Sequence, residues 1–305
     1  MDEMQIIELF CIVDDFVKQF DQLYPQEKIS HQTKKIRNRS CKTSLSEVMT
    51  ILMLFHRSHY RTFKHFFLLN VKVNMKHLFP QLVGYSRFVQ LMSHAFFPMF
   101  CFVKQHQGAW GELQFVDSTV LTCCHVKRAS SHRTFRSSAR WGKTTTGWFF
   151  GFKLHLIINQ HAEIVAFRIT KGNIDDRKPV LGMVNGKKGK LFGDRGYISE
   201  KLRTDLLKKG MLLITKLKRD MKNKLMTTYD KLMLRKRALI ESVHNLLKSD
   251  CQIEHHRHRS PWNFLSNLFS ALGAYCLNPN KPRLHFPTQE IEELHSLPDF
   301  SMKLC

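Results

Sequence analysis

The sequence lacks any hydrophobic run long enough to cross a membrane. One of its longest apolar runs, Gly147-Trp-Phe-Phe-Gly-Phe152, is followed at once by Lys153 and then by His155, whereas a spanning helix needs roughly 20 apolar residues. The first residues, Met1-Asp-Glu-Met4, are acidic and lack the basic start of a signal peptide. We therefore expect a cytoplasmic protein without a membrane partner.

Paired cysteine spacing is also absent. The 8 cysteines form no Cys-x-x-Cys pair, which argues against structural zinc, and a cytoplasmic setting favours free thiols. Two groups could still supply zinc ligands, and these are Cys123-Cys124-His125 and Cys251 with His255, His256 and His258. We favour the simpler interpretation, in which they are buried thiols and a solvated basic loop.

Acidic residues are scarce relative to basic ones. The chain has 48 Lys and Arg against 25 Asp and Glu, which gives a formal charge of +23 and a pI of about 9.9. The segment from Lys187 to Arg237 alone contains 17 basic and 5 acidic residues, a net charge of +12. Such a charge favours a polyanionic partner, with nucleic acid ahead of an anionic membrane surface.

The first 108 residues are predicted to be helical. Apolar residues recur at helical spacing from Met4 to Phe20, and Ser44-Leu-Ser-Glu47 has the form of a capping box before a helix to Leu54. A further amphipathic helix is expected from Tyr85 to Val103. The segment Lys28–Lys42 has six basic residues and no acidic one. We predict a helical DNA-binding domain over 1–108; the alternative is a helical cap with a solvated basic loop.

From about residue 110 the pattern changes to strands that alternate with helices. The expected strands are 113–119, 148–159, 163–170, 190–194 and 211–218, and the expected helices start at Asp175-Asp176-Arg-Lys-Pro179 and span 199–209, 229–249 and 261–277. This order is that of an RNase H-like sheet, although other α/β domains share parts of it. We predict a mixed α/β fold, with an RNase H-like catalytic domain (a mixed five-stranded sheet and flanking helices) over 109–278 and an irregular tail over 279–305.

Three acidic residues sit where such a fold could bring them together. Asp117 follows the apolar run Leu113–Val116, Asp194 follows the expected strand from Lys190, and Glu241 lies on the expected late helix. Each alone has a simpler interpretation, as a strand-end turn or a solvated helix residue. Three carboxylates together can hold Mg²⁺, which prefers hard oxygen ligands and can activate and stabilise the oxygens of a phosphodiester.

The helix around Glu241 also carries cations. At about 100° per residue, Arg237, His244 and Lys248 fall on the same face as Glu241. They could hold DNA phosphates beside the metals, or they could merely pair with Glu241 and solubilise the helix. A basic loop between His125 and Lys143 has no acidic residue and is a second candidate for phosphate contacts.

Together these motifs resemble a known family. The pattern Asp117-Ser-Thr, Gly147-Trp-Phe-Phe-Gly-Phe-Lys-Leu-His155, Asp175-Asp-Arg-Lys-Pro179, Gly193-Asp-Arg-Gly-Tyr197 and Arg237-x₃-Glu241-x₆-Lys248 is similar to bacterial insertion-sequence transposases of the DDE class. It is most similar to the family designated nine-eight-two, which is related to the family-four and family-five groups. Related transposases carry a tyrosine in the last motif where this chain has Leu234, and Tyr229 is offset by five positions.

The resemblance implies a site and its cofactor. Asp117, Asp194 and Glu241 would be the catalytic metal ligands for Mg²⁺, with Mn²⁺ as a substitute. The expected DNA-contacting residues are Arg237, His244, Lys248, Arg195, Lys127, Arg128, Arg140, Lys143 and Lys153. The partners would be double-stranded DNA, both the terminal inverted repeats and the target, and a second copy of the chain in the active complex.

The implied activity is cleavage at the element's ends and transfer of the freed 3′-OH into target DNA. Two alternatives remain open, a metal-dependent DNA nuclease without strand transfer and an inactive DNA-binding remnant. Trp141 and Trp148, near the basic loop, could stack on a displaced base. Packing in the core or on a strand face is the favoured interpretation.

Overall fold

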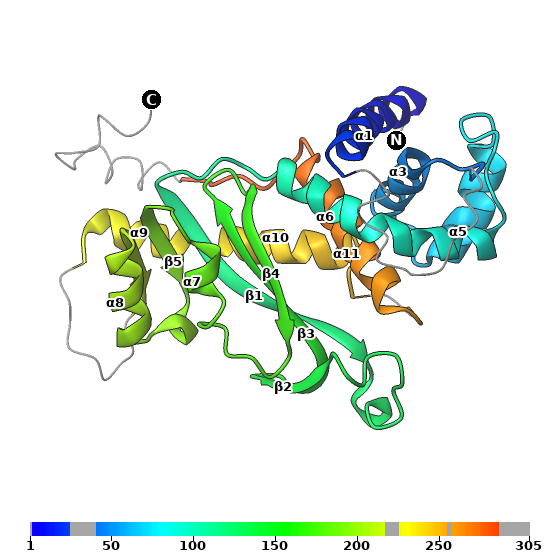
Figure 1. The fold of residues 1–305 in the computed structure, drawn as a ribbon. Helices are drawn as coiled ribbons and strands as arrows, with labels where there is room; N and C mark the ends of the chain where they lie inside the picture. The colour runs from blue at the N-terminus through cyan, green and yellow to red at the C-terminus, as the bar shows by residue number, and fades with distance from the viewer. Residues whose placement is uncertain (1, 25–40, 217–225, 255–257, 287–305) are drawn as a thin grey trace. The chain divides into compact units, whose positions relative to one another are not determined.

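The protein folds into two units. The computed structural model describes residues 2–24, 41–216, 226–254 and 258–286 (Figure 1). The helical unit contains the chain up to residue 106 together with 132–137 and 246–278. The sheet unit contains residues 107–131 and 138–245, with the described residues from 279 onward.

Helices of several kinds build the helical unit. In chain order they are α1 (Glu3–Leu23), α3 (Leu45–Phe55), α4 (Phe63–His65), the π-helix η1 (Phe66–Asn74), α5 (Tyr85–Met92), the 3-10 helix η2 (Ser93–Ala95), α6 (Phe96–Gln105) and α11 (Pro261–Cys276). The predicted capping box at α3 is confirmed, because Ser44 accepts from the N–H of Glu47 and the Glu47 side chain accepts from the N–H of Ser44. The basic segment Lys28–Lys42 lies almost wholly outside the described residues.

The helix α11 is the buried centre of this unit. Nearly every residue from Asn263 to Tyr275 is buried, and the helix packs on α3 and α6. A side chain at Gly273 would lie 3.4 Å from the Phe102 ring, so glycine allows the close approach. From the sequence we expected this helix in the domain 109–278, whereas it packs in the helical unit. A helix that is apolar on most sides is buried by surrounding elements, here other helices.

The helix predicted from Tyr85 to Val103 is wrong as one element. It divides at η2, and Pro98 is the third residue of the next helix, α6. Proline has no N–H for the bond back to His94, so the regular α-helical pattern cannot continue through this point. The segment from Phe63 to Asn74, which had no prediction, forms α4 and the π-helix η1, and π-helical geometry departs from the 3.6-residue period.

The sheet unit contains six strands and short helices. The strands are β1 (Leu113–Cys124), β2 (Arg140–Thr144), β3 (Gly147–Asn159), β4 (Ile164–Lys171), β5 (Gly189–Gly193) and β6 (Met211–Thr215). The helices are η3 (Val126–Arg128), α7 (Val180–Met183), η4 (Arg195–Tyr197), α8 (Glu200–Lys208) and α9 (Thr228–Lys236), and α10 (Ala238–Ser249) runs on from α9. The sheet order is β2-β3-β1-β5-β6, and β4 also pairs with β3.

The connections of this sheet are RNase H-like. β3 is antiparallel to β1 and to β4, whereas β5 is parallel to β1 and β6 is parallel to β5. This confirms the predicted mixed sheet with flanking helices. The prediction of five strands is wrong by one, because β2 lies inside the segment 125–143 that was expected to be a loop. β2 pairs with the first residues of β3.

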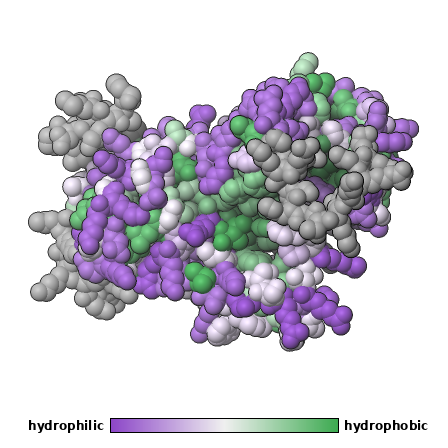
Figure 2. All heavy atoms as spheres, viewed as in Figure 1, coloured by the Kyte–Doolittle hydropathy of each residue, from purple (hydrophilic) through white to green (hydrophobic). Residues whose placement is uncertain are grey.

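The two faces of the sheet differ. Helices α7 and α8 lie beside β5 (Figure 1). Val116 and Ile157 share a core with residues of these helices, which include Val180, Leu202 and Leu206. Figure 2 shows mainly hydrophilic side chains over the outer side of α8. Asp117 alternates with Val116 along β1, so its side chain points to the opposite face.

The described residues contain no helix long and apolar enough to span a membrane. Residues 279–286 form neither helix nor strand, and residues 287–305 of the predicted tail lie outside the described residues.

Candidate active site

Asp117 lies in the middle of β1 rather than at its end. The strand continues through Cys124 because Thr119, Leu121 and Thr122 keep pairing with β3. Asp117 sits opposite Leu156, and its side chain is 21% exposed. One carboxylate oxygen, Oδ1, accepts from the N–H of Ser118 at 2.8 Å, which fixes the carboxylate close to the backbone.

The sheet register brings Asp194 next to Asp117. β1 and β5 are parallel, with Phe115 beside Phe192. The pairing ends there, and Asp117 and Asp194 each follow two residues later, so that the charge of Asp194 acts on the Asp117 carboxyl. Asp194 follows β5 and caps η4, since its Oδ1 accepts from the N–H of Gly196 at 2.8 Å.

Glu241 joins this group through Arg237. The guanidinium of Arg237 donates through Nη1 to Asp117 Oδ2 at 3.2 Å and through Nη2 to Glu241 Oε1 at 2.5 Å. The single helix expected over 229–249 is interrupted at this position, where α9 ends and α10 begins. One cation therefore spans two of the three predicted acids.

Burial changes the acidity of Asp117. Removal from water raises its pKa to about 6, and the neighbouring Asp194 carboxylate raises it as well. The N–H of Ser118 and the guanidinium of Arg237 act in the opposite direction, because both favour the charged carboxylate. The electrostatic effect of Asp194 on Asp117 is consistent with the register of their strands.

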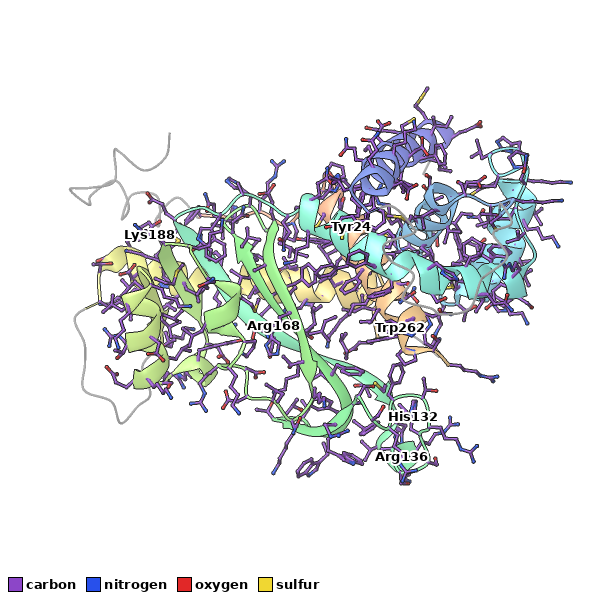
Figure 3. All side chains as sticks on the ribbon, viewed as in Figure 1. Tyr24, His132, Arg136, Arg168, Lys188 and Trp262 are labelled. Atoms are coloured by element: carbon purple, nitrogen blue, oxygen red, sulfur yellow. The ribbon has the colours of Figure 1, made fainter. Side chains whose placement is uncertain are left out.

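The predicted DNA-contacting residues fall into three settings. His244 is buried, and its Nδ1 lies 4.0 Å from Asp117 Oδ2, so it belongs to the acidic cluster. Lys248 forms an ion pair with Glu254 at 2.8 Å. The remaining surface residues are exposed, and they are Lys127, Arg128, Arg140, Lys143 and Arg195. Figure 3 shows His132 and Arg136 on the long connection between β1 and β2.

Lys153 differs from the other predicted cations. Its side chain is only 12% exposed, and its ammonium donates to Asp176 Oδ1 at 2.9 Å and to the carbonyl of Ile174 at 3.0 Å. A phosphate would have to displace both partners. The sequence analysis expected a DNA contact at Lys153 because it did not relate this lysine to Asp175-Asp176. That acidic motif follows β4 and brings a carboxylate to Lys153.

Sequence reasoning also missed Tyr197. It is 2% exposed, and burial together with the charges of Asp117, Asp176 and Asp194 raises the pKa of its phenol far above the usual range. Its ring is part of the hydrophobic core that also contains Val116. The motif Gly193-Asp-Arg-Gly-Tyr197 could have predicted this burial, because an aromatic ring three residues after an acid at the end of a strand can pack back on that strand.

The chemistry of this cluster suits a hard divalent cation. The candidate ligands are carboxylate oxygens, and the Arg237 guanidinium already supplies positive charge between two of them. Among the described residues, however, no three Asp, Glu, His or Cys side chains stand close enough to form a ready-made metal site. The residues fit Mg²⁺ only if the Arg237 side chain moves aside. Neither zinc-like cysteine group forms such a cluster within the described part of the chain, and His255 and His256 lie outside it.

The mixed sheet and the acidic residues at Asp117 and Asp194 lie within the part of the chain that matches a known family. A family model described as the transposase DDE domain matches residues 107–261. The chain belongs to this family. Leu234, where related transposases carry tyrosine, is 5% exposed.

Comparison with solved structures gives a weaker similarity. The chain is similar to the cryo-EM structure of the piggyBac transposase synaptic complex with hairpin DNA, with 13% identity and a TM-score of 0.36. The match covers 73% of this chain and 52% of the other, so the chain spans about half the length of that protein. No curated protein matches the sequence.

Proposed function

We propose that this protein is the transposase of a bacterial insertion sequence of family nine-eight-two. It binds the terminal inverted repeats of its element, cleaves DNA at the element's ends and joins the freed 3′-OH to target DNA. The observation that carries this proposal is the Arg237 bridge between Asp117 and Glu241, with Asp194 directly after the adjoining strand, inside a transposase DDE domain.

In this proposal Asp117, Asp194 and Glu241 hold Mg²⁺, with Mn²⁺ as a substitute. The bound metal would activate the attacking oxygen and stabilise the leaving oxygen of the phosphodiester. In the structure, Arg237 pairs with both Asp117 and Glu241 and offsets part of their negative charge. When its guanidinium is released from the carboxylates, it can donate to a DNA phosphate instead, and a planar guanidinium suits that bidentate contact.

The rest of the site would position the DNA. The exposed cations Lys127, Arg128, Arg140, Lys143 and Arg195 attract the phosphate backbone without reading base sequence. The formal charge of +23 supports a DNA partner. Joining two ends to one target requires both ends in one complex, so we propose a homodimer in the active assembly.

The test is a product analysis with purified protein, Mg²⁺ or Mn²⁺, and labelled DNA that carries the inverted repeats. The proposal predicts cleavage at the element's 3′ ends and joined products, both lost in Asp117→Asn. Removing a metal ligand costs several kcal/mol of transition-state stabilisation, so the loss should be about 1,000-fold or more. Nicks without joints would indicate a nuclease, and DNA binding without metal-dependent chemistry would indicate a remnant.

A further inference from the structure

Two tryptophans of the β2–β3 hairpin expose their indole rings. The side chain of Trp148 is 59% exposed and that of Trp141 is 41% exposed. Indole rings bury a large apolar surface when they pack inside a protein, so such exposure is a notable cost in water. Neither ring is buried in the core, although Trp141 does pack on the face of β3 against Phe150, and the exposure that remains requires an explanation.

The hairpin holds both rings on one face. The register pairs Trp141 with Phe150 and Lys143 with Trp148, and directly opposed residues of antiparallel strands share a face. The Trp141 ring packs edge-on against Phe150, with centroids 5.7 Å apart. The Lys143 ammonium lies 5.6 Å from the centre of the Trp148 ring. The result is an aromatic surface, formed by Trp141 and Trp148, with a cation directly attached to it.

This aromatic surface lies on the same face of the sheet as Asp117. Leu156, the partner of Asp117, and Trp148 are both on β3 and are separated by an even number of residues, so their side chains point the same way. Eight residues of strand span about 26 Å, which corresponds to roughly 8 nucleotides along one strand of DNA. The β3 side chains between these two points, Phe150, Phe152 and Leu154, are buried, so the aromatic surface is an exposed site at the far end of β3 from the acidic cluster.

The local charge favours a negatively charged partner over a neutral or basic one, and the exposed rings favour a nucleic acid among such partners. No Asp or Glu occurs between Asp117 and Glu163 in the sequence, whereas this stretch contains basic residues at Arg140, Lys143 and Lys153. Lys143 and Arg140 on β2 are exposed. Aromatic rings beside cations bind single-stranded nucleic acid by stacking on bases, and each stacked base contributes about 1–3 kcal/mol.

We propose that Trp141 and Trp148 form a binding site for unpaired nucleobases of a DNA strand. Bases inside a duplex already stack on their neighbours, so only an unpaired segment can offer its faces to the indoles. This inference rests on the proposed function in one respect, because it assumes that DNA is the substrate. The aromatic surface would give the protein a preference for single-stranded DNA segments, which the acidic cluster alone does not provide. Unpaired bases could come from the element's end or from opened target DNA.

The test measures DNA affinity by fluorescence anisotropy with the full-length protein, without metal, so that no strand is cut. The probes are an oligothymidylate of about 12 nucleotides, a blunt duplex, and duplexes with an unpaired segment either at the repeat end or in a target-like bubble. We expect the double variant Trp141→Ala/Trp148→Ala to bind the oligothymidylate at least about tenfold more weakly, and to bind the blunt duplex almost unchanged.

The matched control is Trp262→Ala. Trp262 is 53% exposed and packs against Phe96 in the helical unit. Its substitution therefore removes a similarly exposed indole that lies outside the aromatic surface. It should leave both affinities unchanged, and Trp148→Phe should retain most of the binding because phenylalanine still stacks. Quenching of tryptophan fluorescence by the oligothymidylate should likewise decrease in the double variant but persist in Trp262→Ala.

Two results would overturn the proposal. The first is equal oligothymidylate affinity for the wild type and the double variant. The second is a double variant that loses self-association, as judged by sedimentation, with no selective loss of single-strand binding, which would make this surface a protein interface. The comparison of end and bubble probes identifies the source of the unpaired bases.

Failure of this proposal is distinguishable from failure of the proposed function. A wild type that cleaves and joins end DNA, with no effect of the double variant on single-strand binding, would refute only the aromatic site. A wild type that binds single strands through the tryptophans but shows no metal-dependent chemistry would refute only the transposase.

Discussion

Arg237 contacts Asp117 across 120 residues of sequence, and the same guanidinium contacts Glu241 one helical turn later. A cationic side chain thus lies where carboxylates from a strand and from a helix converge. Three negative charges in a partly buried site would repel one another without it. Arg237 consequently stabilises the acidic cluster in the absence of metal, and it must release the acids before they can bind one.

Replacement of this bridge should destabilise the metal-free protein. We predict that Arg237→Gln lowers the free energy of unfolding by about 1–3 kcal/mol in EDTA, because Asp117 loses its partly buried charge partner. Mg²⁺ should restore much of the loss by replacing the guanidinium. Urea denaturation with and without Mg²⁺ measures both effects. Lys231→Gln, an exposed change on α9, is the control, and equal stability of Arg237→Gln and wild type in EDTA would contradict the prediction.

Metal affinity should depend on pH through Asp117. Burial raises the pKa of this carboxyl to about 6, so it holds a proton below that pH and must release it to bind a cation. We predict that Mn²⁺ affinity is nearly constant above about pH 6 and falls up to tenfold for each unit of pH below it. A Mn²⁺ titration from about pH 7 to about pH 5 checks this. Affinity that does not change over the range would show that Asp117 is not a ligand.

The same raised pKa has a consequence for stability. The unfolded chain releases the Asp117 proton near the ordinary value of 3.8, whereas the folded chain keeps it to about 6. As the pH rises between these values, the metal-free folded state therefore loses stability relative to the unfolded state. Asp117→Asn should remove this loss.

Two lysines of β2 and β3 should differ in their effect on DNA binding. Lys143 is exposed on β2, whereas Lys153 is nearly buried and bound to Asp176. We predict that Lys143→Gln lowers the slope of log affinity against log salt concentration by about 1, and that Lys153→Gln leaves it unchanged. Duplex binding measured over a series of salt concentrations tests this. A lower slope for Lys153→Gln would mean that its pair with Asp176 opens on DNA.

The helical unit should lose stability in mild acid because of His56. Its ring is buried, its Nδ1 donates to the carbonyl of Cys251 at 2.6 Å, and burial lowers its pKa from 6.5 to about 4. The unfolded chain therefore binds a proton that the folded chain excludes. The stabilisation is complete above about pH 6.5 and decreases by up to about 3 kcal/mol as the pH falls toward 4.

Chemical denaturation of His56→Gln between these pH values should show a weaker dependence than the wild type. Exposed His161→Gln should keep the wild-type dependence. Identical slopes for His56→Gln and wild type would show that His56 is not the group responsible.

The catalytic sheet could be predicted largely from the sequence, because its strands carry their own pattern. β3 and β4 were recognisable from their apolar residues and the intervening turn, and β5 from the residues before Asp194. β2 was missed because its basic and polar residues resemble those of the adjoining loop. It becomes a strand only by pairing with the start of β3, which is a tertiary effect.

The candidate site shows a similar division. The acids Asp117 and Asp194 could be related through the expected sheet, since neighbouring parallel strands place their ends together. The pairing of Lys153 with Asp176 and the burial of Tyr197 depend on side chains from distant segments. The helical-face argument offered pairing of Arg237 with Glu241 only as an alternative to phosphate binding, and the structure shows that pair, although the helix is interrupted at Arg237 itself.

The most direct measurement is the fraction of labelled inverted-repeat DNA cleaved at the 3′ end in Mg²⁺ by three proteins, namely the wild type, Glu241→Gln and Glu254→Gln. Glu254 is a control because it pairs with Lys248 and has no proposed metal role. The account predicts cleavage by the wild type and Glu254→Gln, and a loss of about 1,000-fold in Glu241→Gln. Cleavage by Glu241→Gln at the wild-type rate would contradict the assignment of the three acids as the catalytic site.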